Sequence, residues 1–174
     1  MQHKHGSPIE LDIKAIGDDG LFAGYASVFN VKDRGGDIVM PGAFTKSLQT
    51  YPPARVKLLY QHNTTEPIGV WTKFEEDRRG LKAEGRLILE TAKGREVHAL
   101  MKAGAVDGLS IGFRTIRDAV DREKGARLLH ELELREVSIV TFPMNEDATV
   151  SSVKSTNASV SELVAAISAA RANL

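Results

Sequence analysis

Small or apolar side chains alternate with polar ones along much of this chain, most regularly over residues 81–89. Leu81, Ala83, Gly85, Leu87 and Leu89 fall at every second position, which puts them on one face of an extended strand. Further strand-like runs cover residues 9–13, 21–29, 56–61, 68–74, 108–114 and 128–142. Gly, Pro, Asp and Asn cluster between several of these runs, so the sequence predicts a mainly β fold of mostly antiparallel strands.

Two short helices are expected between the strands. One covers residues 43–48 and ends before Pro52 and Pro53, because proline cannot continue a helix interior. The other is capped by Thr91 and runs to about Ala103, with apolar side chains on one face. The two helices make the predicted fold α+β while leaving it mainly β.

The last two strands of the predicted sheet differ from the others in charge and in phase. Residues 117–126 are rich in charge and predict a hairpin loop, which the long strand over 128–142 follows. Within that strand the apolar side chains change from even to odd positions. Such a change of phase predicts a β-bulge near Arg135 and Glu136.

Composition divides the chain into three parts. Residues 1–8 form a polar leader, in which His3 and His5 are not expected to bind a metal. Residues 9–150 are expected to form one compact domain. Residues 151–174 are rich in Ser, Ala and Asn and predict a linker. A capping-box pattern before an apolar stripe predicts a short amphipathic helix there, docked on the domain or on a partner chain.

Charge and residue types exclude several classes of function. Lys plus Arg equals Asp plus Glu at 23 each, so no net basic charge favours a nucleic-acid partner. The absence of cysteine excludes disulfides, a thiolate nucleophile and thiolate metal ligands. No apolar run approaches the roughly 20 residues that span a bilayer, and no phosphate-binding loop or HExxH motif occurs. We therefore expect no nucleic acid, membrane, metal or cofactor as a partner.

Three polar residues with complementary chemistry lie in or beside these apolar runs: His62, Ser110 and Glu136. A serine hydroxyl becomes an effective nucleophile when a nearby base takes its proton, and histidine is the usual base. A carboxylate then orients the imidazole and stabilises its positive form. The sequence therefore predicts a serine-hydrolase site, with Ser110 as nucleophile, His62 as base and Glu136 as the third member.

Each of these residues also has an ordinary structural explanation. His62 follows a strand and could be an exposed or hydrogen-bonded histidine. Ser110 could be a strand serine whose neighbouring glycines serve packing. Glu136 could be an edge-strand carboxylate paired with Arg135 or Arg114. Spacing along the chain leaves these alternatives open.

Other residues near the predicted site are candidates for weaker roles. Gly108 and Gly112 share the face of Ser110 and would leave room for a substrate backbone. Backbone N–H groups, with help from Arg114, could stabilise an oxyanion. His98, on the second predicted helix, and His130, within the last strand, are weaker candidates for the base.

Four segments in fixed order resemble the prohead protease family of tailed phages, whose fold is related to that of the herpesvirus assemblins. They cover residues 24–29 with 36–44, 59–62 with 67–69, 108–113, and 136–143. The order of four segments is more specific than any one of them. The second, third and fourth contain His62, Ser110 and Glu136. The assemblins use a second histidine as the third member, so Glu136 is where this chain departs from them.

The resemblance implies an antiparallel β-barrel ringed by a few short helices, as in the herpesvirus proteases. It implies a serine endopeptidase in the host cytoplasm, inside the assembling prohead, which cleaves scaffold or capsid precursor segments and also itself. Gly112 and Arg114 stay candidates for substrate or oxyanion binding on the residue arguments above. The related folds often work as dimers or inside larger assemblies, so a homodimer is one expected assembly. One alternative is a non-catalytic assembly or scaffold-binding protein on the same fold, and another is an esterase or amidase that acts on small molecules.

Overall fold

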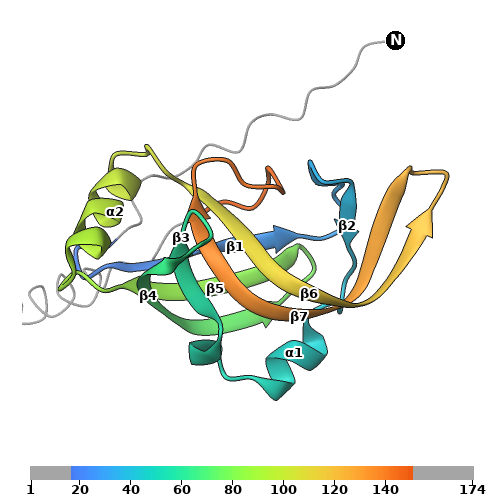
Figure 1. Ribbon diagram of the computed structural model, residues 1–174, viewed down its shortest axis with the longest axis horizontal. Coiled ribbons are helices and arrows are strands. Elements are labelled where there is room, and N and C mark those ends of the chain that lie inside the picture. The colour runs from blue at the N-terminus through green and yellow to red at the C-terminus, as the bar shows by residue number, and fades with distance from the viewer. Residues whose placement is uncertain (1–16, 151–174) are drawn as a thin grey trace, which may run out of the picture.

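The computed structural model describes residues 17–150 (Figure 1). The elements are β1 (Leu21–Val28), β2 (Asp37–Val39), α1 (Thr45–Thr50), a 3-10 turn η2 (Pro53–Arg55), β3 (Lys57–Tyr60), β4 (Asn63–Glu76), β5 (Gly80–Leu87), α2 (Ala92–Lys102), β6 (Gly108–Asp121) and β7 (Ala126–Val140). The predicted leader, the predicted strand over 9–13 and the predicted C-terminal helix lie outside the described residues.

All seven strands belong to one curled sheet whose central member is β7. The order β1-β5-β4-β3 continues into β7, and each neighbouring pair up to β3 is antiparallel. One edge of β7 pairs with β6 in antiparallel fashion, while the other edge pairs in parallel with both β2 and β3. The expectation of a mainly β fold with mostly antiparallel strands is therefore confirmed. Both parallel pairings involve strands that reach β7 through long connections, which a parallel pair requires.

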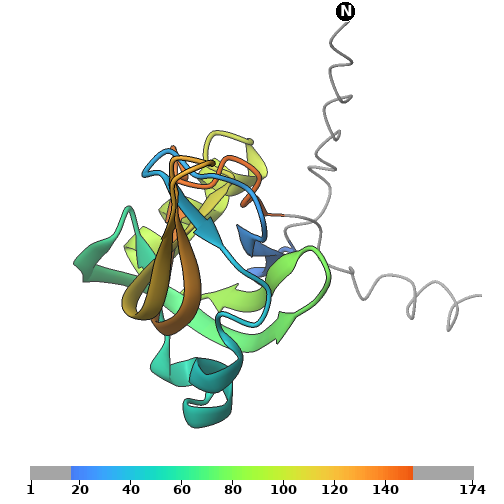
Figure 2. The ribbon, with the colours of Figure 1, turned by 90° about the vertical axis from the view of Figure 1, so that its right-hand side faces the viewer.

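The sheet curls into a half-barrel, and the segment after β7 lies between its two ends. The Tyr25 N–H of β1 donates to the Thr149 carbonyl at 3.0 Å, and the Leu109 N–H of β6 donates to the Ala148 carbonyl at 2.9 Å. Figure 2 shows the curl from the side, with the β6–β7 hairpin toward the viewer. Residues 148–150 thus connect β1 to β6 by backbone hydrogen bonds.

Trp71 of β4 is buried in the core and contacts the neighbouring strands β3 and β7. Its side chain is buried, with Phe22 edge-on at 5.4 Å between ring centroids. The indole N–H lies 3.3 Å from both the Lys57 carbonyl of β3 and the Val137 carbonyl of β7. Gly85 is part of the alternation on β5 because a Cβ there would lie only 2.8 Å from the indole ring. The large apolar surface of tryptophan and its single polar donor together hold β3 against β7.

Both predicted helices are present within the described range, with one shift. α2 begins after Thr91, whose hydroxyl accepts from the Gly94 N–H at 3.0 Å, as expected. α1 covers 45–50 rather than 43–48. Ala43 and Phe44 are fully buried and form the turn before the helix, so their apolar character reflects core packing.

The predicted hairpin loop over 117–126 is wrong in extent. β6 continues to Asp121 and β7 begins at Ala126, so the turn spans only 122–125. This end of the hairpin projects from the domain (Figure 1), and charged side chains occupy both of its faces because both contact solvent. The predicted β-bulge is confirmed, since Gly112 pairs with Glu136 and Phe113 with Leu134, which leaves Arg135 as the extra residue.

Candidate active site

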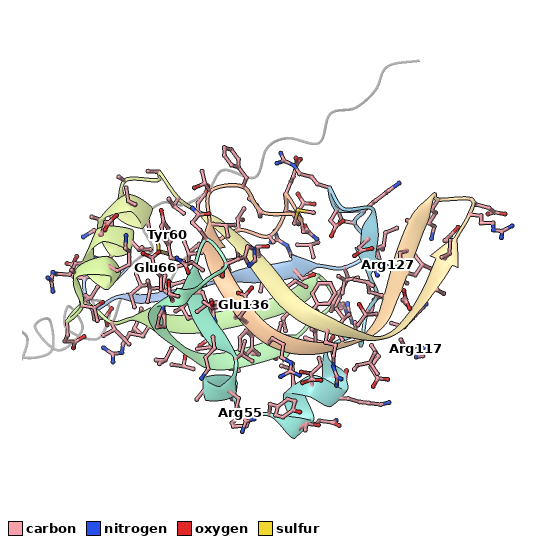
Figure 3. All side chains as sticks on the ribbon, in the orientation of Figure 1. Arg55, Tyr60, Glu66, Arg117, Arg127 and Glu136 are labelled. Carbon is pink, nitrogen blue, oxygen red and sulfur yellow. The ribbon has the colours of Figure 1, made fainter. Side chains whose placement is uncertain are left out.

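The side chains of Ser110, His62 and Glu136 form one hydrogen-bonded chain. His62 Nε2 lies 2.9 Å from Ser110 Oγ, and His62 Nδ1 lies 2.6 Å from Glu136 Oε1. Ser110 belongs to β6, His62 to the turn after β3, and Glu136 to β7. Figure 3 labels Glu136 where β3 and β7 run side by side. The three residues predicted from the sequence therefore lie in direct contact.

His62 is positioned by a tight two-residue turn between β3 and β4. Gln61 and His62 both have positive φ, at 53° and 58°, between the paired residues Tyr60 and Asn63. Such hairpin turns favour Asn-Gly because side chains are disfavoured at positive φ. The Gln61 N–H donates to the Ile139 carbonyl at 2.9 Å, and its side-chain amide donates to a hydroxyl on the segment after β7 at 2.7 Å. These bonds stabilise a turn whose intrinsic cost is of order 1–3 kcal/mol per residue.

Glu136 reaches His62 because of the β-bulge beside it. The extra residue, Arg135, changes the phase of β7, so Glu136 and Ser138 share the face of the site. Glu136 Oε1 meets His62, and Glu136 Oε2 accepts a hydrogen bond from Ser138 Oγ at 2.7 Å. The carboxylate is therefore held at both oxygens, and its side chain is only 15% exposed.

Ser138 is a site residue that the sequence reasoning missed. Its hydroxyl is fully buried, donates to Glu136 Oε2 and accepts from the His62 backbone N–H at 3.2 Å. It thus connects the carboxylate to the turn that carries the imidazole. The signal was present in the sequence, because a serine two positions after Glu136 on an otherwise apolar strand needs a polar partner.

The glycines beside Ser110 do not leave space for a substrate backbone. A Cβ at Gly112 would lie 2.2 Å from Glu136 Oε1, so the Glu136 side chain fills that space. A Cβ at Gly108 would lie 2.7 Å from both the Pro143 ring and the Val140 carbonyl. The prediction that Gly108 and Gly112 leave room for a substrate backbone is wrong. Both glycines instead allow β7 side chains and the turn after β7 to pack against β6.

The remaining predicted residues lie in other contacts. Arg114 Nε donates to Glu133 at 2.9 Å, and no hydrogen bond joins its side chain to the Ser110–His62–Glu136 chain within the described range. His98 lies 2.9 Å from the Gly17 carbonyl, away from these three residues. His130 is half-buried on β7 and makes no side-chain hydrogen bond among residues 17–150. An oxyanion role for Gly112 or Arg114 stays a prediction.

The electrostatics of the site favour a charged imidazole. The hydrogen bond to Glu136 raises the pKa of His62 above its ordinary value of 6.5, while partial burial acts in the opposite direction. With Glu136 accepting at Nδ1, the neutral tautomer carries its proton there and leaves Nε2 free to accept from Ser110. This arrangement is able to take a proton from a serine hydroxyl and to stabilise the imidazolium that results.

No group of side chains within residues 17–150 has the arrangement of a metal site. Neither helix of this part of the chain is long and apolar enough to cross a membrane.

Comparison with known proteins agrees with this geometry. The family model for the caudovirus prohead serine protease matches residues 9–162, a range that contains all three contacting side chains. This chain belongs to that family. The resemblance predicted from the four ordered segments is confirmed.

Individual members and structures agree with the family assignment. The prohead protease of Enterobacteria phage HK97 is 39% identical over 150 residues, which cover 84% of this chain and 66% of the relative. The capsid polyprotein of Pseudomonas phage PAJU2 is 35% identical over 153 residues, which cover 83% of this chain and 22% of that protein. The chain thus spans about two thirds of the first relative and about a fifth of the second.

A solved structure confirms the predicted fold class of this family member. The KSHV protease, solved with a hexapeptide phosphonate inhibitor, superposes with a TM-score of 0.53 at 11% identity. The superposition covers 75% of this chain and 63% of that protein. The mainly β, herpesvirus-protease-like architecture with few short helices is therefore confirmed, and the likeness concerns the fold.

Proposed function

We propose that this protein is a serine endopeptidase that cleaves through an acyl-enzyme at Ser110. The observation that carries the proposal is the hydrogen-bonded chain from Ser110 Oγ through His62 to Glu136, with distances of 2.9 and 2.6 Å. Each member has the chemistry that its position requires: a hydroxyl, an imidazole and a nearly buried carboxylate. Membership of a serine protease family supports the same reaction.

In the proposed first step, Ser110 Oγ attacks the scissile carbonyl carbon while His62 Nε2 takes the hydroxyl proton. The carbonyl oxygen becomes an oxyanion, and Glu136 stabilises the imidazolium without taking its proton. The imidazolium then protonates the departing amine, the C–N bond breaks, and the acyl group stays on Ser110. Water repeats the sequence, with His62 again as base, and releases the carboxylic acid.

Ser138 acts in this mechanism as a positioning residue. It touches neither the substrate nor the transferred proton, but it fixes Glu136 Oε2 and the His62 backbone N–H at the same time. A fixed carboxylate keeps the imidazole in the tautomer that accepts from Ser110. Preorganisation of this kind lowers the reorganisation needed during each proton transfer.

The proposed substrates are scaffold or capsid precursor segments inside the assembling prohead of the infected host cell. The names of the HK97 and PAJU2 relatives, a prohead protease and a capsid polyprotein, support this assignment. Self-cleavage in the Ser/Ala-rich tail, with residues 153–155 as one candidate site, and homodimerisation are further parts of the proposal. The tail lies outside the described residues.

The experiment is intact-mass spectrometry of wild type and Ser110→Ala, each incubated with its scaffold-bearing capsid precursor. Cleavage by wild type alone supports the proposal, and equal cleavage by both proteins removes Ser110 from the role of nucleophile. Cleavage by neither, together with no reaction of Ser110 with a fluorophosphonate, would instead favour a non-catalytic assembly protein. An intact C-terminus in active enzyme would refute self-cleavage in the tail.

A further inference from the structure

A cavity of about 160 Å³ lies beside Ser110, on the side of β6 that faces β1. Its walls come from β6, from the end of β1, from the loop that leads to β2, from β2 itself, and from Met144 and Asn145 after β7. Ser110 is itself one of the lining residues. The cavity therefore adjoins the residue that we propose as nucleophile.

Hydrogen bonds across the cavity hold its walls in place. The Arg34 N–H donates to the Met144 carbonyl at 3.0 Å, and the Arg34 guanidinium binds Glu146 at 2.6 Å. The Asn145 side-chain amide donates to the Val28 carbonyl at 2.9 Å. These contacts join the loop before β2, the end of β1 and the segment after β7. The cavity is thus preformed, which reduces the entropy lost when a ligand binds.

The charged groups in the cavity wall are already engaged. Both carboxylate oxygens of Asp37 accept from Arg127, at 2.8 and 2.6 Å. Asp33 Oδ1 accepts from the backbone N–H groups of Gly35 and Asp37, each at 2.8 Å. A cationic substrate side chain would find Asp37 neutralised, and an anionic one would meet two carboxylates. The charges of this wall therefore disfavour an anionic ligand, and Arg127 already occupies both carboxylate oxygens of Asp37.

Most of the remaining wall is apolar, and Ser27, Ser110 and Asn145 are its polar members. Val31, Val39, Leu109, Ile111 and Phe113 contribute most of it. For comparison of size, an engineered protein cavity of about 150 Å³ lined by Leu, Ile and Phe holds a benzene molecule. The volume beside Ser110 thus fits the side chain of Leu, Met or Phe.

The position of His62 decides which half of a substrate enters the cavity. Within the described range the lining includes Ser110 but neither His62 nor Glu136. The departing amine must lie next to His62 Nε2 in order to receive its proton. The side of Ser110 away from the imidazole is therefore left to the residue that supplies the scissile carbonyl.

We propose that this cavity binds the side chain of that carbonyl-supplying residue and selects an apolar side chain such as Val, Leu, Met or Phe, which is compatible with cleavage after Val153 in the candidate segment 153–155. The inference rests on the proposed function of Ser110. Burial of an apolar side chain stabilises the transition state because it removes apolar surface from water. A difference of one methylene in such a pocket changes rates by about 10- to 200-fold.

The test uses aminoalkyl diphenyl phosphonates that differ only in the side chain placed beside phosphorus. Ser110 Oγ forms a bond to phosphorus, phenoxide leaves, and His62 takes the serine proton, so the inactivation rate reports the side-chain preference. We expect probes with Leu, Met or Phe side chains to inactivate the full chain at least about tenfold faster than the Gly probe. The inactivation rates of the Glu and Lys probes should not exceed that of the Gly probe.

Two variants connect that preference to the cavity. Val31→Trp fills the cavity and should bring the ratio of Leu to Gly rates close to one. Val120→Trp is the matched control, because Val120 lies on the projecting hairpin, is 75% exposed and does not line the cavity. Val120→Trp should keep the wild-type ratio of Leu to Gly rates. An equal fall of this ratio in both variants would overturn the assignment of the cavity as the side-chain site.

The outcomes separate the cavity from the proposed function. If a fluorophosphonate without a side chain labels Ser110 but all diphenyl phosphonates react at equal rates, the cavity is not the subsite and the protease mechanism stands. A preference for Glu or Lys would overturn the inference in the same way. If no probe labels Ser110 in the presence of capsid precursor, with Ser110→Ala as blank, both proposals fail.

Discussion

Gly112→Ala is expected to disable the site without unfolding the domain. The added Cβ would lie 2.2 Å from Glu136 Oε1 and 2.8 Å from both Cγ and Cδ of that side chain, whereas ordinary contact begins at 3.4 Å. The carboxylate must therefore move by about 1 Å. Its bond to His62 Nδ1 is 2.6 Å long, so a shift of that size away from the strand stretches the bond beyond hydrogen-bond range.

The expected loss in kcat/KM is about 10²- to 10⁴-fold. A misplacement of about 1 Å costs about 10²-fold, and loss of the correct imidazole tautomer in serine proteases costs about 10⁴-fold. The displaced atoms belong to the end of a flexible side chain, so the melting temperature should change little compared with the activity. The assay is the rate of Ser110 labelling by a fluorophosphonate, with cleavage of capsid precursor as a second readout.

A double-mutant cycle with Glu136→Ala tests the cause. If Gly112→Ala acts through Glu136, the double variant should be no slower than Glu136→Ala alone, because the clash has gone. Multiplied losses would mean that the added methyl blocks substrate directly. Wild-type activity in Gly112→Ala would refute the reasoning altogether, since it would require a functional site without the observed Glu136 position.

Four further predictions concern the site and the buried serine Ser27. Ser138→Ala removes the hydroxyl that joins Glu136 to the His62 backbone, and kcat/KM should fall about 10- to 100-fold, with the acid limb of the pH profile displaced; an unchanged rate and profile would exclude the positioning role. In wild type, kcat/KM should fall as pH drops through the raised pKa of His62, because the protonated imidazole cannot accept the serine proton. Glu136→Gln should lower that pKa and move the acid limb to lower pH, which a pH–rate profile and imidazole titration by NMR would check. Ser27→Ala should raise the free energy of unfolding in urea by about 1 kcal/mol, because its buried hydroxyl has no hydrogen-bond partner among residues 17–150; a decrease would reveal a partner.

Much of the sheet could be predicted because local pattern and burial agree. The alternation over 81–89 predicted β5, which ends at Leu87, and the change of phase on the last strand predicted the bulge at Arg135. The hairpin beyond Arg117 escaped prediction because a strand with two solvent-exposed faces has no apolar alternation. Charge in that segment indicated exposure correctly but did not indicate backbone conformation.

At the site, the identities of the three contacting residues could be predicted from the sequence. The packing of their neighbours could not. His62, Ser110 and Glu136 each carry a reactive group in an unusual place, which a sequence displays directly. The role of Gly112 depends on the Glu136 side chain, which arrives from another strand. The left-handed turn at Gln61 and His62 contains no glycine or asparagine and is stabilised by contacts with β7, so local turn preferences gave no indication of it.

The central place of β7 also controls when this chain can become reactive during its synthesis. Glu136 emerges from the ribosome 74 positions after His62, and the parallel pairing of β3 with β7 forms only when β7 is complete. A nascent or truncated chain that stops before β7 therefore carries a serine and a histidine with no scaffold to align them. Hydrolysis by this site is therefore delayed until the whole sheet has formed. Hydrolytic activity can then be used as an assay of complete folding.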